Sequence, residues 1–184
     1  MNDDHSPLIL RSGIDQIQKN NAIIDQMKYS SVKRRLKREL ELMNTQFLYS
    51  NIIVEADTES SVKVSVYEIS ADAKIQKYGF IVTSNYPFNP PKIFYQNRPY
   101  TDFLKTSYDT NFRKLFKKIV GQECFCCHSI NCSDNWSPAI TLSRIIDEVK
   151  YIKQKKRDII NKLLADKIKF RYLIDDINLD VWLF

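Results

Sequence analysis

Glycine is scarce in this sequence, and cysteine is missing outside one short segment. Only three of the 184 residues are glycine, which excludes collagen-like and low-complexity proteins. No apolar run approaches the roughly 20 residues that a membrane-spanning helix needs. The first residues, 1–5, lack the basic and apolar stretches of a secretory signal. We therefore expect one domain of ordinary size with extensions, located in the reducing cytoplasm or nucleus and not in a membrane.

The charge of the chain limits the partners that it can bind. Its 28 basic and 22 acidic residues give a formal net charge of +6, which is compatible with a nucleic acid or with an acidic protein surface. The two signs are interspersed along the chain, and this weakens the nucleic-acid interpretation. Binding of nucleic acid through the basic residues 150–157 is the least favoured hypothesis.

Apolar periodicity predicts an α+β protein. Residues 31–43 and 142–152 each carry an apolar face at helical spacing, and a shorter helix is expected from Phe112 to a stop near Gly121. Alternating and β-branched residues predict a four-stranded antiparallel meander between the first and last helices. The strands are expected near residues 47–55, 62–67, 78–83 and 93–95.

Segments on both sides of this core are treated as extensions. The predicted organisation is an N-terminal extension at 1–30, a core at 31–152 and a C-terminal helical extension at 153–184. Isoleucines in the first extension are a weak sign of an amphipathic helix. Apolar residues are missing from 153–158, which predicts either two helices or one helix whose middle stands clear of the core. The apolar end, 181–184, is expected to dock on the body.

All four cysteines lie in the nine residues from Cys124 to Cys132. In a reducing compartment such clusters are more often catalytic or metal-binding than bridged. Cys124 and Cys127 have the spacing of half a zinc site, to which His128 or Cys132 could add ligands. Four ligands from so short a stretch would be cramped, and the only other histidine is His5. Catalytic use of one thiol is therefore favoured over packed thiols or a metal, and no cofactor is expected.

Two motifs around this segment resemble those of the ubiquitin-conjugating enzymes. Residues 86–93 read Tyr-Pro-Phe-Asn-Pro-Pro-Lys-Ile, and residues 136–142 read Trp-Ser-Pro-Ala-Ile-Thr-Leu. They occur in the family's order, with a basic helix upstream and a cysteine just before the tryptophan. The resemblance covers about residues 30–150, and the cysteine-rich segment is similar to that of divergent members encoded by large DNA viruses.

The resemblance implies the UBC-like fold, with an N-terminal helix, a four-stranded meander and C-terminal helices. It also implies acyl transfer at a cysteine. The thiolate accepts ubiquitin, or a ubiquitin-like modifier, from an activating enzyme, and a lysine of a protein substrate then attacks the thioester.

The resemblance also indicates which cysteine is the nucleophile. Cys132 is favoured because its surroundings are similar to the family's Ser-Ile-Cys-Leu-Asp, with one residue inserted. Cys127 and Cys126 come next, since they lie nearer the family's usual spacing from the tryptophan. Asp134 is expected to orient or deprotonate the substrate lysine, and Asn131 or Asn135 to supply the oxyanion donor. An ordinary turn-forming role is the alternative for these side chains.

A ligase-binding surface is the further implication of the resemblance. In the family, the aromatic of the first motif, the Ser-Pro-Ala of the second and basic residues of the first helix contact RING or HECT ligases. An aromatic on a rigid proline-rich loop suits a binding hot spot, and core packing is its alternative. The corresponding residues are Phe88, Ser137, Pro138, Ala139, Arg34, Lys37 and Arg38.

One family motif is absent. The family has His-Pro-Asn after the Pro-Pro-Lys strand, where this chain has Arg98, Pro99 and Tyr100. About a dozen extra residues also separate the two motifs. A catalytically inactive variant that binds ubiquitin or a ligase is therefore the alternative to an active enzyme.

Overall fold

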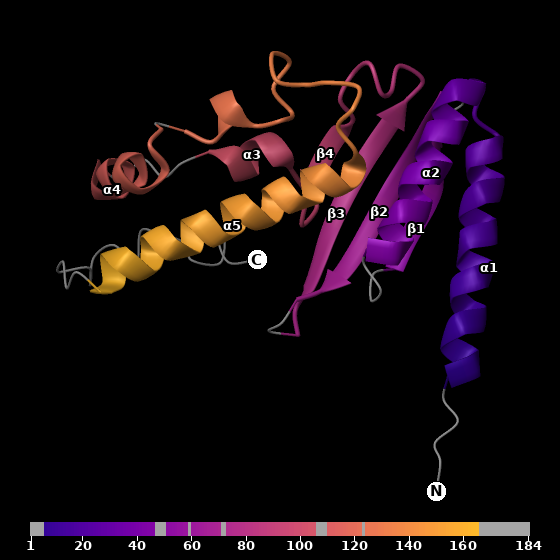
Figure 1. The fold of residues 1–184 in the computed structure, drawn as a ribbon, viewed down its shortest axis with the longest axis horizontal. Coiled ribbons are helices and arrows are strands. Elements are labelled where there is room, and N and C mark those ends of the chain that lie inside the picture. Colours follow the sequence, from indigo (N-terminus) through magenta and orange to yellow (C-terminus); the bar gives the residue numbers. More distant parts are fainter. Residues whose placement is uncertain are drawn as a thin grey trace, which may run out of the picture. The chain divides into compact units, whose positions relative to one another are not determined.

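The computed structural model describes residues 6–46, 51–58, 60–70, 73–105, 110–122 and 124–165. The described chain forms two compact units. The first contains the described residues up to Asn97 together with Ser137–Thr141, and the second contains the described residues from Arg98 to Trp136 and from Leu142 to Ala165. Figure 1 shows the elements of both units. The extension limits inferred from the sequence stay a prediction.

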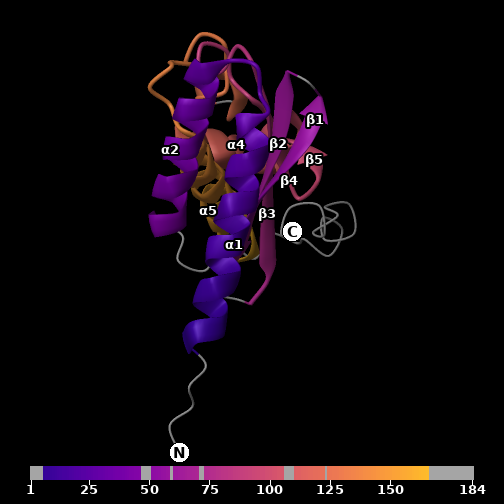
Figure 2. The ribbon, with the colours of Figure 1, turned by 90° about the vertical axis from the view of Figure 1, so that its right-hand side faces the viewer.

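The first unit consists of two helices and an antiparallel meander. Its elements are α1 (Ser6–Asp25), α2 (Ser30–Gln46), β1 (Asn51–Thr58), β2 (Ser61–Ile69), β3 (Ile75–Thr83) and β4 (Lys92–Tyr95). The strands lie in sequence order from β1 to β4, and the two-residue strand β5 (Arg98–Pro99), which belongs to the second unit, follows β4 in the sheet order. The α+β class and an antiparallel sheet with its strands in sequence order are therefore confirmed, with five strands where four were predicted. Both helices run beside the strands of this unit (Figure 2).

Cross-strand pairs explain which face of the sheet is buried. Opposite residues of β2 and β3 pair as Val62 with Val82, Val64 with Phe80, and Val66 with Tyr78. All six side chains are buried. Because side chains alternate between the two faces of a strand, the period-2 pattern of the sequence brings them to one face.

Helix α2 buries the apolar face that its sequence predicts. It begins at Ser30, one residue before the predicted range, and ends at Gln46, three residues beyond it. No side chain on its predicted apolar face is more than 4% exposed. These side chains belong to Val32, Leu36, Leu40 and Met43.

Helix α1 covers β1 of the same unit. The Asn20 side-chain amide donates to the carbonyl of Ile52 (2.8 Å), and its oxygen accepts from the amide of Val54 (3.0 Å). Ile24 is fully buried, whereas Ile17 is exposed. The weak helical signal in this segment thus corresponds to a helix that satisfies backbone groups of an edge strand, a position otherwise open to pairing with other chains.

The second unit is mainly helical. It contains α3 (Tyr100–Leu104), α4 (Thr110–Val120), the short 3₁₀ helix η1 (Cys126–His128) and α5 (Leu142–Ala165). Helix α4 is the predicted short helix. Gly121 follows it with φ +76° and donates its amide to the Lys117 carbonyl at 2.9 Å. A glycine is suited to this left-handed position because it has no Cβ.

The last described helix corrects one expectation. Residues 142–165 form a single helix, and its middle does not stand clear of the core, because Lys156 is only 1% exposed. The Lys156 ammonium donates to the carbonyls of Phe103 and Lys105. The polar run at 153–158 therefore contains a buried lysine whose ammonium is hydrogen-bonded. No described helix is long and apolar enough to span a bilayer. The predicted docking of residues 181–184 lies outside the described residues.

Candidate functional site

Three of the four cysteines meet in one cluster in the second unit. The Sγ–Sγ distances are 2.7 Å for Cys124–Cys126, 3.3 Å for Cys124–Cys127 and 3.8 Å for Cys126–Cys127. Within the described part of the chain, these three sulfur atoms form the only group of possible metal ligands that all lie within 4.8 Å of one another. Cys132 does not belong to this group. The structure therefore divides the segment into a thiol cluster and a separate cysteine.

The thiols of this cluster are not core side chains. Cys126 and Cys127 are exposed and Cys124 is half-buried. The buried member of the segment is Phe125, whose ring meets the ring of Phe116 edge-on, with centroids 4.7 Å apart. Phe125 therefore anchors the segment, and packing does not account for the three thiols.

Mutual hydrogen bonding shifts the pKa values within the cluster. The contact with Cys126 is the largest effect on Cys124 and lowers the pKa of the Cys124 thiol. The same contact, assisted by burial, raises the pKa of Cys126 to about 11. Hydrogen bonding to Cys124 also raises the pKa of Cys127. The mutual hydrogen bonds therefore favour ionisation of Cys124 over that of Cys126 and Cys127.

Glu148 on α5 holds the loop that follows the cluster. Its carboxylate accepts from the Ser129 hydroxyl (3.0 Å), the Ile130 amide (2.9 Å) and the Tyr100 hydroxyl (2.7 Å). Burial, followed by the neighbouring Glu148 charge, raises the pKa of Tyr100. Sequence reasoning missed this network because no local pattern links residues 48 positions apart.

Asn135 also makes hydrogen bonds to this loop. Its side-chain amide donates to the carbonyls of Cys127 (2.9 Å) and Ser129 (3.1 Å). Both N–H groups of the amide are therefore engaged, which favours Asn131 over Asn135 as the oxyanion donor.

The three predicted catalytic residues lie on this loop. Cys132 is half-buried, and its carbonyl accepts from the amides of Asn135 and Trp136, both at 2.9 Å. Asp134 is exposed and accepts from the Ser133 hydroxyl at 3.2 Å. The Asn131 side-chain oxygen is buried and has no hydrogen-bond partner among the described residues. The catalytic roles of Cys132, Asp134 and Asn131 stay predictions.

The predicted ligase-contact residues lie in the first unit. Phe88 is 76% exposed, so core packing is not its role. Ser137, Pro138 and Ala139 are exposed in a turn that is closed by the Ile140 amide donating to the Ser137 carbonyl at 2.9 Å.

The basic residues of α2 are not equally available. Arg34 and Arg38 are exposed. Lys37 is half-buried, and its ammonium pairs with the Asp25 carboxylate at 2.8 Å. Of the three predicted basic contacts, Arg34 and Arg38 therefore present their charges most openly.

A buried carboxylate joins three segments of the first unit. Glu39 on α2 is 3% exposed and accepts from the Tyr86 hydroxyl at 2.6 Å and from Nε of Arg35. A second nitrogen of Arg35, Nη2, donates to the Ile140 carbonyl at 3.1 Å. Helix α2, the proline-rich loop and the Ser137–Thr141 segment are thereby connected. We call the residues Arg35, Glu39 and Tyr86 the Glu39 hub.

Burial and the Glu39 charge shift the pKa values of the two residues that bind Glu39. Burial, followed by the Glu39 charge, raises the pKa of Tyr86. Burial of Arg35 disfavours its charge, but the hydrogen bond and attraction of Glu39 raise the pKa of Arg35 overall. Sequence reasoning missed the hub. The available signal was that Glu39 lies beside Leu40 and three residues after Leu36, at the border of the apolar face.

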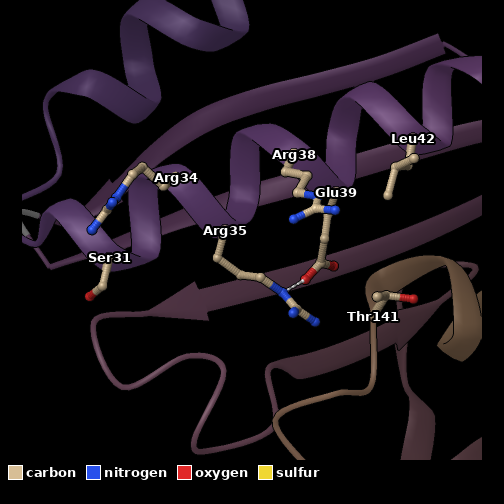
Figure 3. A pocket seen from close by; sticks show the side chains of 7 residues that line it. All are labelled: Ser31, Arg34, Arg35, Arg38, Glu39, Leu42 and Thr141. Carbon is tan, nitrogen blue, oxygen red and sulfur yellow. Dashed lines mark hydrogen bonds and ion pairs between the residues drawn. The ribbon is translucent and has the colours of Figure 1, made fainter.

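A basic cavity of about 540 Å³ lies against α2 (Figure 3). Two of its arginines, Arg34 and Arg38, are exposed, and the third, Arg35, pairs with Glu39. Leu42 adds an exposed apolar side chain to the wall. The lining residues are Ser31, Arg34, Arg35, Arg38, Glu39, Leu42 and Thr141.

Comparisons of this chain with protein-family models, curated proteins and solved structures find no match.

Proposed function

We propose that this chain is a ubiquitin-conjugating enzyme of UBC-like fold, which carries a modifier as a thioester on Cys132 and passes it to a substrate lysine with a ligase. The observation that carries the proposal is the Glu39 hub. It joins three segments that are far apart in the sequence and that the family resemblance assigns to one ligase-binding surface. Two of these segments expose Phe88 and Pro138, and the third exposes Arg34 and Arg38.

The proposed chemistry is two successive acyl transfers at sulfur. The Cys132 thiolate attacks the carbonyl of the activating enzyme's thioester, and the activating enzyme's thiolate leaves. A substrate amine then attacks the new thioester, the Cys132 thiolate leaves, and the amine loses its proton to the exposed carboxylate of Asp134. The side-chain amide of Asn131 is the proposed donor to the oxyanion of each step.

The thiol cluster supports Cys132 as the nucleophile. Hydrogen bonding raises the pKa of Cys126 to about 11 and also raises the pKa of Cys127, and a protonated thiol is a poor nucleophile. The Cys124 sulfur is already engaged by hydrogen bonds with both neighbours. Cys132 lies outside this group of sulfur atoms, so its attack does not require the cluster to break.

The first prediction concerns loading. Incubation of the chain with activating enzyme, ATP and ubiquitin is expected to give an adduct that a thiol reductant cleaves, observed by non-reducing electrophoresis. Cys132→Ser is expected to abolish the reducible adduct, because a hydroxyl forms no thioester. Cys127→Ser is the matched control and should load like the wild type. An unchanged adduct in Cys132→Ser, or its loss only in Cys127→Ser, would contradict the assignment.

The second prediction concerns ligase binding. Phe88→Ala is expected to lower the affinity for a cognate RING or HECT domain by about 2 kcal/mol, roughly 30-fold, as loss of an aromatic hot spot does. Because Phe88 is 76% exposed, the unfolding free energy should change by less than about 0.5 kcal/mol. Calorimetric titration and denaturant unfolding measure the two effects. Asn89→Ala, on the same loop, should bind normally, and equal losses in both variants would count against the surface.

One observation favours the inactive alternative. Tyr100 stands in the place of the family's His-Pro-Asn asparagine, and it is 1% exposed with its hydroxyl donating to Glu148. It therefore cannot replace an asparagine as an oxyanion donor. Absence of loading with several activating enzymes, together with ligase binding that depends on Phe88, would identify a non-catalytic binding protein.

A further inference from the structure

We propose that Cys124, Cys126 and Cys127 form a binding site for a thiophilic metal ion, with zinc as the preferred ion. The proposal does not depend on thioester chemistry, because Cys132 is not one of the ligands. Three sulfur atoms within 3.8 Å of one another can contact a single ion. Thiolates are the ligands that zinc and other soft ions select.

The separations of the sulfur atoms fit a shared cation. Zinc–thiolate bonds of about 2.3 Å in a tetrahedron place two sulfur atoms roughly 3.8 Å apart. The Cys126–Cys127 pair has this separation, at 3.8 Å. The other two pairs, at 2.7 and 3.3 Å, must lengthen, and side chains at the surface can do so without disturbing the core.

Packing of Phe125 and hydrogen bonds to backbone carbonyls hold the cysteine segment in place before an ion binds. Phe125 fixes the segment from inside by packing on Phe116. The Cys127 carbonyl accepts from Asn135, and the Cys126 carbonyl accepts from the Ser129 amide at 3.3 Å. Ligands held in place before binding lose little conformational entropy when the ion enters.

Exposure of the cluster argues for a ligand. Unbridged cysteine is among the residue types most often found fully buried. Here Cys126 and Cys127 are exposed next to each other while the neighbouring Phe125 is buried. Among the described residues no other possible ligand atom joins the group within 4.8 Å. Of the four positions that zinc usually has, these three thiols would fill three, which leaves one for water or another ligand.

The test is metal titration of the full chain. Reduced, metal-free protein is titrated with Co²⁺, whose thiolate complexes have a sulfur-to-metal charge-transfer band, and zinc affinity is measured by competition with a chromophoric chelator. Wild type is expected to show the band and to bind one zinc ion. Cys126→Ser and Cys127→Ser are expected to lower the zinc affinity by at least about 100-fold, the upper range for loss of outer-shell partners.

Cys132→Ser is the matched control, and it should keep both the band and the affinity. Circular dichroism should show the same fold for all variants, because Cys126 and Cys127 are exposed. Three results would overturn the proposal: no charge-transfer band in the wild type, an unchanged affinity in Cys127→Ser, or an equal loss in Cys132→Ser. The two proposals fail separately, since loading is assigned to Cys132 and metal binding to the other three cysteines.

Discussion

Replacement of Glu39 by alanine is expected to lower the free energy of unfolding by about 3 kcal/mol, because the buried hydroxyl of Tyr86 loses its hydrogen bond to the carboxylate and Arg35 loses its counter-ion. The expected value lies at the lower end of the range for buried pairs because the Arg35 side chain is 29% exposed and water can solvate it. Urea unfolding at neutral pH measures the change. Glu41→Ala, an exposed neighbour on α2, should have nearly wild-type stability.

The same variant is expected to weaken ligase binding although Glu39 itself is only 3% exposed. The reason is that Arg35 and Tyr86 connect α2 to the Ile140 carbonyl and to the proline-rich loop through Glu39. Glu39→Gln keeps an acceptor for Tyr86 and should fall between wild type and alanine in both measurements. A Glu39→Ala protein that is destabilised yet binds a ligase like the wild type would show that the Glu39 hub does not organise the binding surface.

The stability of the wild type is expected to rise between about pH 7 and pH 10.5 relative to that of Lys156→Met. Burial lowers the pKa of Lys156 from 10.5 to about 7 in the folded chain. Between these pH values the unfolded state binds the proton and the folded state does not, so raising the pH favours folding. Below about pH 7 both states are protonated, and the cost of burying the ammonium is fully present.

The size of this effect follows from the shift and from the contacts of Lys156. The lowering of the Lys156 pKa from 10.5 to about 7 corresponds to roughly 5 kcal/mol, and the hydrogen bonds from the ammonium to the carbonyls of Phe103 and Lys105 oppose this shift. We expect a difference of about 2–4 kcal/mol between the two pH extremes.

Urea unfolding of both proteins from pH 7 to pH 10 measures this difference. Lys162→Met, at an exposed position of α5, controls for loss of a surface charge and should follow the wild-type profile. Methionine leaves the Phe103 and Lys105 carbonyls without the lysine donor, but this lowers the stability of Lys156→Met equally at every pH. Parallel pH profiles for wild type and Lys156→Met would contradict a neutralised buried lysine.

Local sequence patterns were enough to predict α2, α4 and the strands β1 to β4. In α2 the residues from Val32 to Met43 recur at helical spacing, and in β2 the valines alternate. Burial of such faces depends mainly on spacing along the chain, so the pattern is visible without a structure. The same reasoning failed at residues 153–158, where a lysine inside a polar run is buried because a carbonyl on α3 and one just after it accept hydrogen bonds from its ammonium.

The contacts that build the candidate sites could not be predicted in this way. Glu39 and Tyr86 are 47 residues apart, and Glu148 and Tyr100 are 48 apart. Nothing in the residues next to each of them specifies the partner. The spacing of the cysteines likewise allowed several ligand sets, among them ones with His128 or Cys132.

Neighbouring residues in the chain therefore specified the helical and strand faces, the proximity of four thiols and the two motifs that resemble a conjugating enzyme. Only the tertiary structure shows which three thiols lie in contact and that Cys132 lies outside their group. It also shows that Phe88 is exposed. The physical reason is that secondary structure follows from local spacing. Exposure and hydrogen bonding depend instead on segments that meet only after the chain has folded.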